Sequence, residues 1–176
     1  MCKGCALTNI QSIMKKNIIF LLILLSTNLY SQNEELTIQL NDSTSLMLIR
    51  SDFIIEDRQI EFWDERKDAI SLIDNELVYG TDATIPKYEL KKAVLKIGDA
   101  EIELNTVGMY DPWFDNKKPN CRFRITRFLS NPFRLRGSLS IGAGQYFVEW
   151  SIINNKAFRT LISHDTNSIV EEEFFK

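Results

Sequence analysis

Apolar and polar side chains alternate along much of this chain with a period of two residues. Successive side chains of an extended strand point to opposite faces of a sheet, so an alternating run predicts a strand with one buried face. Other short runs are rich in β-branched and aromatic residues, which strands also favour. The segments that we predict as strands are residues 35–40, 45–50, 93–97, 100–104, 122–128, 134–141, 145–153 and 157–163. The side chains that this pattern predicts to be buried are Phe123, Ile125, Phe147 and Ile152.

Short polar turns separate several of these runs. Residues 41–43, 98–99 and 154–156 are each short enough to close a hairpin, and residues 74–75 would close another. Strands joined by such links pair antiparallel. We therefore predict an all-β fold, a single antiparallel β-sandwich or barrel-like domain, and the pattern does not decide between the two.

Helical patterns are few. Residues 63–72 have the length and composition for two helical turns. Pro86 would open a short helix through Ala93, because proline is tolerated in a first turn. The fold is therefore expected to hold at most one or two short helices.

The N-terminal part of the chain has the pattern of an export signal. Residues 14–16 are Met-Lys-Lys, residues 18–25 are all apolar, and a polar segment then ends at Ser31. The apolar run is shorter than the roughly 18 residues of a membrane-spanning helix, so we expect cleavage and no stable membrane anchor. Lysine-led signals that end in Ser-Gln are common in exported bacterial proteins, and we expect a periplasmic or extracellular location. The predicted divisions are an upstream extension at 1–13, with Met14 as the true start, a signal peptide at 14–31 and one β-rich domain at 32–176.

Cysteine usage limits the chemistry of the predicted domain. Cys2 and Cys5 form a C-x-x-C motif, but no second pair completes a zinc site and export would remove both. Only Cys121 remains after residue 31, so no intramolecular disulfide can form. Stability has to come from a hydrophobic core, for which this length is sufficient. No metal and no cofactor is predicted.

Basic side chains are concentrated in an otherwise acidic chain. The sequence holds 21 Lys and Arg against 24 Asp and Glu, a formal charge of −3. Residues 117–136 nevertheless carry basic side chains and no carboxylate. The arginines that we select as candidate binding residues are Arg122, Arg124, Arg127, Arg134 and Arg136.

The predicted strands would gather several of these arginines on one face. Arg122 and Arg124 alternate with apolar residues, so both would point to solvent. A turn at residues 131–132 would place Arg134 and Arg136 on the neighbouring strand. Guanidinium groups suit carboxylate, sulfate and phosphate, and such a patch would steer an acidic partner.

Carboxylates of the domain itself are the alternative partners for this patch. Glu101 and Glu103 alternate in the same way, and an opposite-charge pair across strands contributes only a few tenths to about 1 kcal/mol. Nucleic acid is not expected as a partner, because the chain is predicted to be exported and its negative charge repels phosphate.

Residues 108–120, GMYDPWFDNKKPN, predict a loop of unusual aromatic content. We select Tyr110, Trp113 and Phe114 as candidate binding residues, because exposed aromatics anchor protein partners or stack on sugar rings. The alternative is that they cover the end of the core. The acidic and amide side chains of this loop do not have the spacing of a calcium-binding loop.

The sequence contains little evidence of a catalytic motif. Ser163, His164 and Asp165 are consecutive, and neighbours in an extended chain point to opposite faces, so they do not predict a triad. Cys121 would act as a nucleophile only if His164 lay beside it. No catalytic residue is therefore predicted.

Three hypotheses about function follow. The favoured one is a non-catalytic exported bacterial β-domain that binds a protein or assembly partner, in the simplest case an acidic one, through the basic strand pair and the aromatic loop. A periplasmic inhibitor or immunity protein would be one instance. The second is a carbohydrate-binding module that uses Trp113 and Tyr110 as stacking platforms, and the third is a small hydrolase with an unrecognised site.

Overall fold

Antiparallel strands make up most of the described part of this protein. The computed structural model describes residues 33–67, 69–114, 122–127 and 133–165. The chain divides into two units, residues 1–32 and 33–176, and every described residue belongs to the second. The predicted upstream extension and signal peptide, and Cys121, lie outside the described residues.

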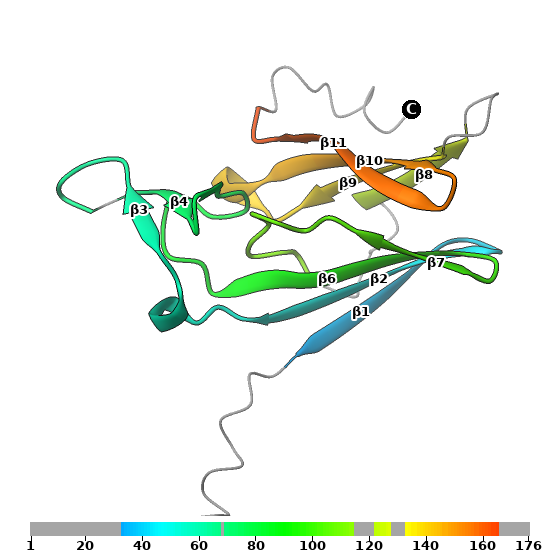
Figure 1. Cartoon of the computed structure of the whole chain (residues 1–176), viewed down its shortest axis with the longest axis horizontal. Coiled ribbons are helices and arrows are strands. Elements are labelled where there is room, and N and C mark those ends of the chain that lie inside the picture. Colours follow the sequence, from blue (N-terminus) through cyan, green and yellow to red (C-terminus); the bar gives the residue numbers. More distant parts are fainter. Residues whose placement is uncertain (1–32, 68, 115–121, 128–132, 166–176) are drawn as a thin grey trace, which may run out of the picture. The chain divides into compact units, whose positions relative to one another are not determined.

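The strands are short and follow one another closely along the chain (Figure 1). Their bounds are β1 Glu34–Asn41, β2 Thr44–Asp52, β3 Ile60–Phe62, β4 Ile70–Ile73, β5 Glu76–Leu77, β6 Tyr88–Ile97, β7 Ala100–Leu104, β8 Phe123–Arg127, β9 Phe133–Leu139, β10 Tyr146–Ile153 and β11 Lys156–Ser163. Two three-residue 3-10 turns accompany them, η1 at Ile55–Asp57 and η3 at Gly142–Gly144.

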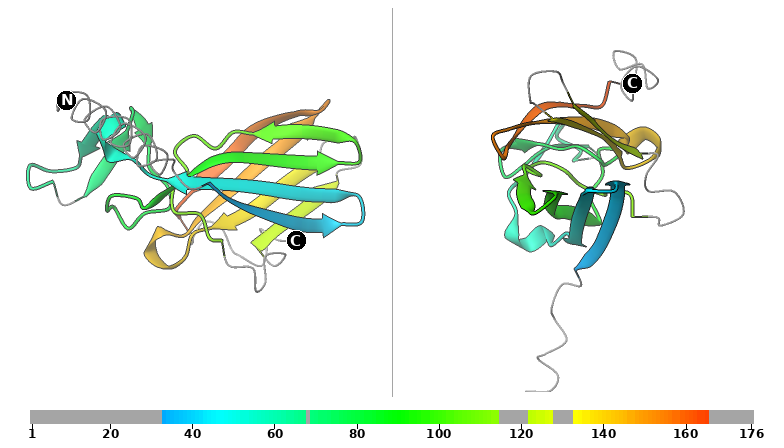
Figure 2. Two further views of the ribbon diagram at one scale, coloured as in Figure 1. Left: turned by 90° about the horizontal axis from the view of Figure 1, so that it is seen from below. Right: turned by 90° about the vertical axis from the view of Figure 1, so that its right-hand side faces the viewer.

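These strands form three antiparallel sheets, in the orders β1-β2-β6-β7, β11-β10-β9-β8 and β3-β4-β5. The two four-stranded sheets face each other, and the small sheet lies beyond one end of them (Figure 2). Each predicted strand segment coincides with a strand, and the predicted turns at 41–43, 74–75, 98–99 and 154–156 lie in the hairpins. The prediction of an all-β antiparallel fold is confirmed.

Both helix predictions are wrong. Tyr88–Ile97 forms β6, where Ala93 pairs with Leu48 on one side and with Leu104 on the other. Hydrogen bonding to two neighbouring strands overrides the local helical pattern. Residues 63–66 form bends and a turn, the Trp63 amide donates to the Ala69 carbonyl at 2.9 Å, and β4 begins at Ile70.

The core lies between the two large sheets, where their alternate side chains meet. Trp150 is completely buried, and its indole Nε1 donates to the Asn105 carbonyl at 3.1 Å. Other buried residues from both sheets include Ile38, Leu46, Leu48, Leu95, Leu135, Tyr146 and Val148. Three of the four residues predicted to be buried, Phe123, Phe147 and Ile152, are buried. Ile125 is only half-buried because β8 is an edge strand of its sheet.

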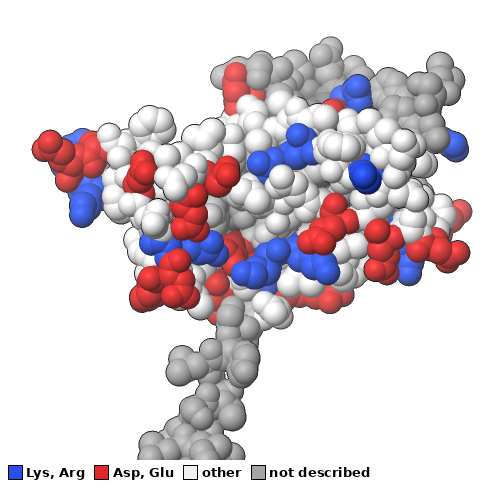
Figure 3. Space-filling view, viewed as in Figure 1, with Lys and Arg blue, Asp and Glu red and all other residues white. Residues whose placement is uncertain are grey.

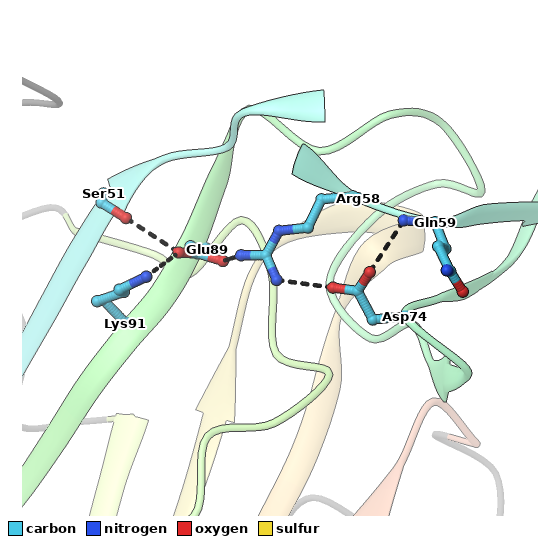
Figure 4. Close-up of polar contacts among 6 residues, drawn as sticks. All are labelled: Ser51, Arg58, Gln59, Asp74, Glu89 and Lys91. Atoms are coloured by element: carbon cyan, nitrogen blue, oxygen red, sulfur yellow. Dashed lines mark hydrogen bonds and ion pairs between the residues drawn. The ribbon is translucent and has the colours of Figure 1, made fainter. Parts of the chain in front are cut away.

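We call β1-β2-β6-β7 the first sheet, β11-β10-β9-β8 the second sheet and β3-β4-β5 the small sheet. Ion pairs and apolar contacts join the small sheet to the first sheet. Arg58 binds Asp74 at 2.7 Å and also contacts Glu89 of β6 (Figure 4). Glu89 further accepts from Lys91 at 2.8 Å, and Asp74 accepts from the Gln59 amide at 2.9 Å. The Gln59 hydrogen bond, followed by that from Arg58, lowers the pKa of Asp74. This polar network therefore favours the ionised carboxylate at the junction.

Tyr110 lies in the apolar part of the same junction. It is buried with Ile70 and Ile73, and its ring meets that of Phe53 edge to face with centroids 5.6 Å apart. Burial raises the pKa of the Tyr110 phenol to about 12. The phenol therefore stays neutral across the physiological range.

Gly80 occupies a position that no other residue fits without displacement. Its φ is +107°, and a Cβ atom there would lie 1.8 Å from the Tyr110 carbonyl oxygen. The close approach accompanies the hydrogen bond from the Tyr110 amide to the Tyr79 carbonyl, at 2.7 Å. This contact fixes the loop after β5 against the residues that follow β7.

We predict that Gly80→Ala lowers the free energy of unfolding by roughly 3 kcal/mol, through the backbone clash and the positive φ. Gly142→Ala is the matched control, because Gly142 also has a positive φ, +67°, but a Cβ there meets nothing within 4 Å. The control is expected to lose about 1 kcal/mol. Urea unfolding measures both, and equal losses would contradict the steric account.

Candidate functional site

A cleft of about 600 Å³ opens where β2 ends and β6 begins. Its walls come from segments that are far apart in the sequence. The lining residues are Arg50, Gly80, Thr81, Asp82, Thr84, Lys87, Tyr88, Asp111, Pro112, Trp113, Phe114, Ser140 and Ile141. We call this the aromatic cleft, and it contains two of the three aromatic residues that the sequence selected.

Asp111 fixes the aromatic loop to the start of β6. Its Oδ1 accepts hydrogen bonds from the Lys87 and Tyr88 amides, both at 2.9 Å, and its own amide donates to the Tyr88 carbonyl at 3.0 Å. Asp111 has a positive φ of 41°, a conformation that aspartate tolerates better than most residues. The chain therefore turns sharply here, and Trp113 and Phe114 face the cleft while Tyr110 stays in the junction with the small sheet.

Arg50 organises one wall of the cleft. Its guanidinium lies over the Tyr88 ring, 4.0 Å from the centroid, and over the Phe114 ring at 4.5 Å. It also forms an ion pair with Glu34 at 2.7 Å and donates to the Pro112 carbonyl at 3.3 Å. Cation–π contacts of this kind contribute about 0.5–2 kcal/mol each. Both rings therefore have a fixed orientation.

Arg122 precedes β8 and contacts Trp113, a residue of the cleft wall, without itself lining the cleft. Its guanidinium lies 4.6 Å from the Trp113 ring centroid and donates to the Ser140 carbonyl at 3.0 Å. The Ser140 hydroxyl is buried and donates to the Gly80 carbonyl at 2.9 Å. Trp113 is half-buried, and Ile141 beside it is 63% exposed. The second wall is thus held by polar contacts but offers apolar surface to solvent.

Sequence reasoning missed Arg50 and Tyr88. Arg50 occupies an ordinary position in an alternating strand, and Tyr88 lies in the segment that was predicted as a helix, so nothing local marks either as a site residue. They become site residues only because β2 and β6 are neighbours and the aromatic loop folds over both.

Arg124, Arg134 and Arg136, which we call the arginine ladder, share the outer face of the second sheet. Arg124 pairs with Arg136 across β8 and β9, and Arg134 pairs with Thr126. Glu149 of β10 lies opposite Arg136 and binds it at 2.8 Å, with Arg134 at 3.9 Å. The predicted basic strand pair therefore exists, and a buried carboxylate of the same chain lies within it.

The two carboxylates suggested as partners for these arginines were the wrong ones. Glu101 and Glu103 belong to β7, in the other sheet, and Glu101 lies 3.9 Å from Lys96. The alternating sequence of β7 is what a strand beside β8 would also show. The order of the strands in the sheets, which this pattern does not give, decides which charges lie opposite each other. On the face shown in Figure 3, acidic and basic side chains lie side by side over the first sheet.

Arg127 lies in a third environment. It pairs with Phe133, on the opposite face of the sheet from the arginine ladder, and its guanidinium lies 5.5 Å from the Phe133 ring centroid. The five candidate arginines therefore divide among the surroundings of the aromatic cleft, the outer face of the second sheet and the end of β9.

His164 packs as an aromatic side chain. Its ring stacks on Tyr79 with centroids 5.0 Å apart, and its two nitrogens lie 3.2 Å from the Val78 carbonyl and 3.4 Å from the Gln145 carbonyl. The Ser163 hydroxyl accepts a hydrogen bond from the Asp165 amide at 3.0 Å. These contacts hold the end of β11 against the loop after β5.

Within residues 33–67, 69–114, 122–127 and 133–165, no group of three potential ligands is arranged to hold a metal ion. No helix in this described part has the length and apolar character needed to cross a membrane.

Compared with known proteins, the chain matches no family model, no curated protein and no solved structure.

Glu149 makes the stability of this sheet depend on pH. Burial alone would raise the pKa of Glu149, but hydrogen bonds from Arg136 and Thr160 lower it below the ordinary 4.5. Because its pKa is lower in the folded state than in the unfolded state, the ionised carboxylate stabilises the fold at pH values above the unfolded-state pKa. This stabilisation is lost as the pH falls through the folded-state pKa.

We predict that Glu149→Gln lowers the free energy of unfolding at pH 7 by about 1–2 kcal/mol. The difference from the unchanged protein should shrink as the pH falls through the folded-state pKa of Glu149, which lies below 4.5, because the native carboxyl then also becomes protonated. Urea unfolding between pH 3 and 7 measures it, with Glu103→Gln on the exposed face of β7 as the control. A loss that is the same at every pH would show that the charge of Glu149 is not responsible.

Proposed function

We propose that this protein is a non-catalytic exported bacterial domain that binds a segment of another protein in the aromatic cleft. The observation that carries the proposal is the cleft itself, with the half-buried rings of Tyr88, Trp113 and Phe114 and the exposed Ile141 around about 600 Å³. This volume lies within the roughly 300–1,000 Å³ typical of ligand pockets, and it suits a few side chains of a peptide.

Polar side chains of the cleft walls are already engaged in hydrogen bonds and ion pairs within the protein, and this supports binding as the role of the cleft. The Asp111 carboxylate already accepts two backbone amides, and Arg50 is held by Glu34 and the Pro112 carbonyl. These contacts position the walls before any ligand arrives, which reduces the entropy lost on association. Ring faces and the Ile141 side chain then provide the apolar contact area, and tryptophan is among the most frequent hot-spot residues of protein interfaces.

Two basic side chains near the cleft, Lys87 and Arg122, suit an apolar anchor residue flanked by an acidic one, although the lining also includes exposed Asp82. Lys87 is exposed at the rim, and Arg122 lies over the Trp113 ring. Such rim charges mainly accelerate association, and their effect weakens as salt rises. The proposed partner is therefore a protein segment with an apolar residue for the cleft and a carboxylate nearby.

We predict that Trp113→Ala weakens capture of this partner by about thirtyfold, the loss of a hot-spot residue worth about 2 kcal/mol. Trp63→Ala is the matched control, because Trp63 is 73% exposed in the turn after β3 and lies outside the cleft lining. The measurement is the amount of one identified protein retained by each immobilised variant, with the fold checked by circular dichroism. Equal retention by both variants would refute the cleft as the binding site.

A carbohydrate is the second candidate ligand, because three aromatic rings line the cleft. It ranks second because the Tyr88, Phe114 and Trp113 rings each already carry a guanidinium on one face. Titration of a glycan panel against intrinsic tryptophan fluorescence should give no saturable change in either the unchanged protein or Trp63→Ala. A saturable change that disappears in Trp113→Ala would favour a carbohydrate-binding module instead.

A further inference from the structure

A second cavity opens at the junction of the small sheet with the first sheet, and we call it the junction pocket. Its volume is about 250 Å³, and its lining shares no residue with the aromatic cleft. Ile73, Leu90 and Met109 contribute its apolar surface, and all three are buried. The volume is below the roughly 300–1,000 Å³ of most ligand pockets, so the junction pocket suits a small molecule or one side chain.

Most charged groups of the junction pocket are already paired within the protein. The Arg58 guanidinium lies between the carboxylates of Asp74 and Glu89 (Figure 4), and Lys91 binds Glu89 at 2.8 Å. Glu76 of β5 differs, because its exposed carboxylate has no hydrogen bond or ion pair within the described part of the chain. Two cations and three carboxylates therefore line the pocket, and the unbalanced negative charge is that of Glu76.

The Tyr110 hydroxyl is a second polar group of the pocket that lacks a partner. Tyr110 is only 6% exposed, yet its hydroxyl makes no hydrogen bond to any described residue. The charges that act on its phenol are those of Arg58, Glu89, Asp74 and Glu76, and all four residues line the pocket. The phenol oxygen therefore faces the pocket. Polar groups of buried residues usually have a hydrogen-bond partner, and a ligand in the pocket would supply one.

These two groups define the chemistry of the ligand. An anion would meet no unpaired cation among the described lining residues, and an uncharged ligand would cover the Glu76 carboxylate without compensation. An ammonium group has three N–H donors and no acceptor, so it can donate to the Glu76 carboxylate and to the Tyr110 oxygen together. A short alkyl chain behind it matches the apolar surface of Leu90 and Met109.

We propose that the junction pocket binds the ammonium group of a short aliphatic primary amine, the chemistry shared by free alkylamines and lysine side chains. Glu76 pairs with the ammonium group, the Tyr110 oxygen accepts one of its hydrogen bonds, and the alkyl chain lies against Leu90 and Met109. Because Glu76 belongs to the small sheet and Leu90 to the first sheet, the bound amine connects these two sheets. The site is separate from the aromatic cleft and does not rest on the function proposed for it.

Titration of the isotopically labelled full chain, followed by NMR, tests this proposal. The probes are pentylammonium chloride and Nα-acetyl-lysine amide at pH 7, where both amines are protonated. We expect saturable shifts of the Glu76, Met109 and Tyr110 amide resonances. The uncharged counterparts, 1-pentanol and Nα-acetyl-norleucine amide, keep the alkyl chain and should bind about tenfold more weakly or less. Binding of the lysine derivative would identify lysine side chains as ligands, whereas binding of pentylammonium alone would identify free amines.

Variants of the two polar groups test their roles. Glu76→Gln should weaken amine binding about tenfold, and Tyr110→Phe, which keeps the ring packed against Phe53, about threefold. Glu61→Gln is the matched control, because Glu61 is an exposed glutamate of β3 in the same small sheet and does not line the pocket. Trp113→Ala, in the aromatic cleft, should also leave amine binding unchanged.

Three results would overturn the proposal. The first is the absence of saturable shifts with both amines, and the second is equal affinity for the amines and their uncharged counterparts. The third is an affinity that Glu76→Gln or Tyr110→Phe leaves at the level of Glu61→Gln. Because the two cavities share no lining residue, none of these results bears on partner binding in the aromatic cleft.

Discussion

Burial of alternate side chains between the two four-stranded sheets determines where every polar group of this domain can lie. The inward positions of β9 and β10 are filled by residues such as Leu135 and Trp150, and those of β2 by Leu46 and Leu48. Charged residues are therefore restricted to the outer faces and to the loops at the ends of the sheets. The aromatic cleft forms at one such end, where the loops after β5, β7 and β9 meet the start of β6. Its rigidity derives from backbone contacts such as those of Gly80 and Asp111.

The same constraint explains the concentration of arginine in an acidic chain. Strand register places Arg136 opposite Glu149, so that one buried carboxylate is held ionised by its neighbours. Arg127 lies three residues from Arg124 along β8, so its side chain points to the other face of the sheet. Arg122 precedes β8, and its guanidinium lies over the Trp113 ring. Two physical roles thus arise from one basic segment. Ion pairing stabilises the sheet, and a cation–π contact holds an aromatic ring in place.

Sequence patterns predicted the strands and hairpins well because these depend on local alternation and turn residues. Phe123 and Ile152 were correctly predicted to be buried for the same reason. The helix predicted through Ala93 failed because strand pairing with Leu48, distant in sequence, and with Leu104 of the next strand decided its conformation. Arg50 with Tyr88, and Glu149 with Arg136, escaped prediction because neither pair is close in sequence. Trp113 and Phe114 were found because aromatic residues are conspicuous in a loop, whereas Tyr110 in the same loop packs against the small sheet.

Site-specific photo-crosslinking tests the central claim, that the aromatic cleft binds a protein segment, most directly. A photoreactive residue replaces Ile141 at the rim of the cleft, or Ile153 at the opposite end of β10 as the control; the two are 63% and 47% exposed. Irradiation in the native host should yield a discrete adduct of higher mass from position 141 and none from position 153. Adducts from position 153 alone, or from neither position, would contradict a partner-binding cleft.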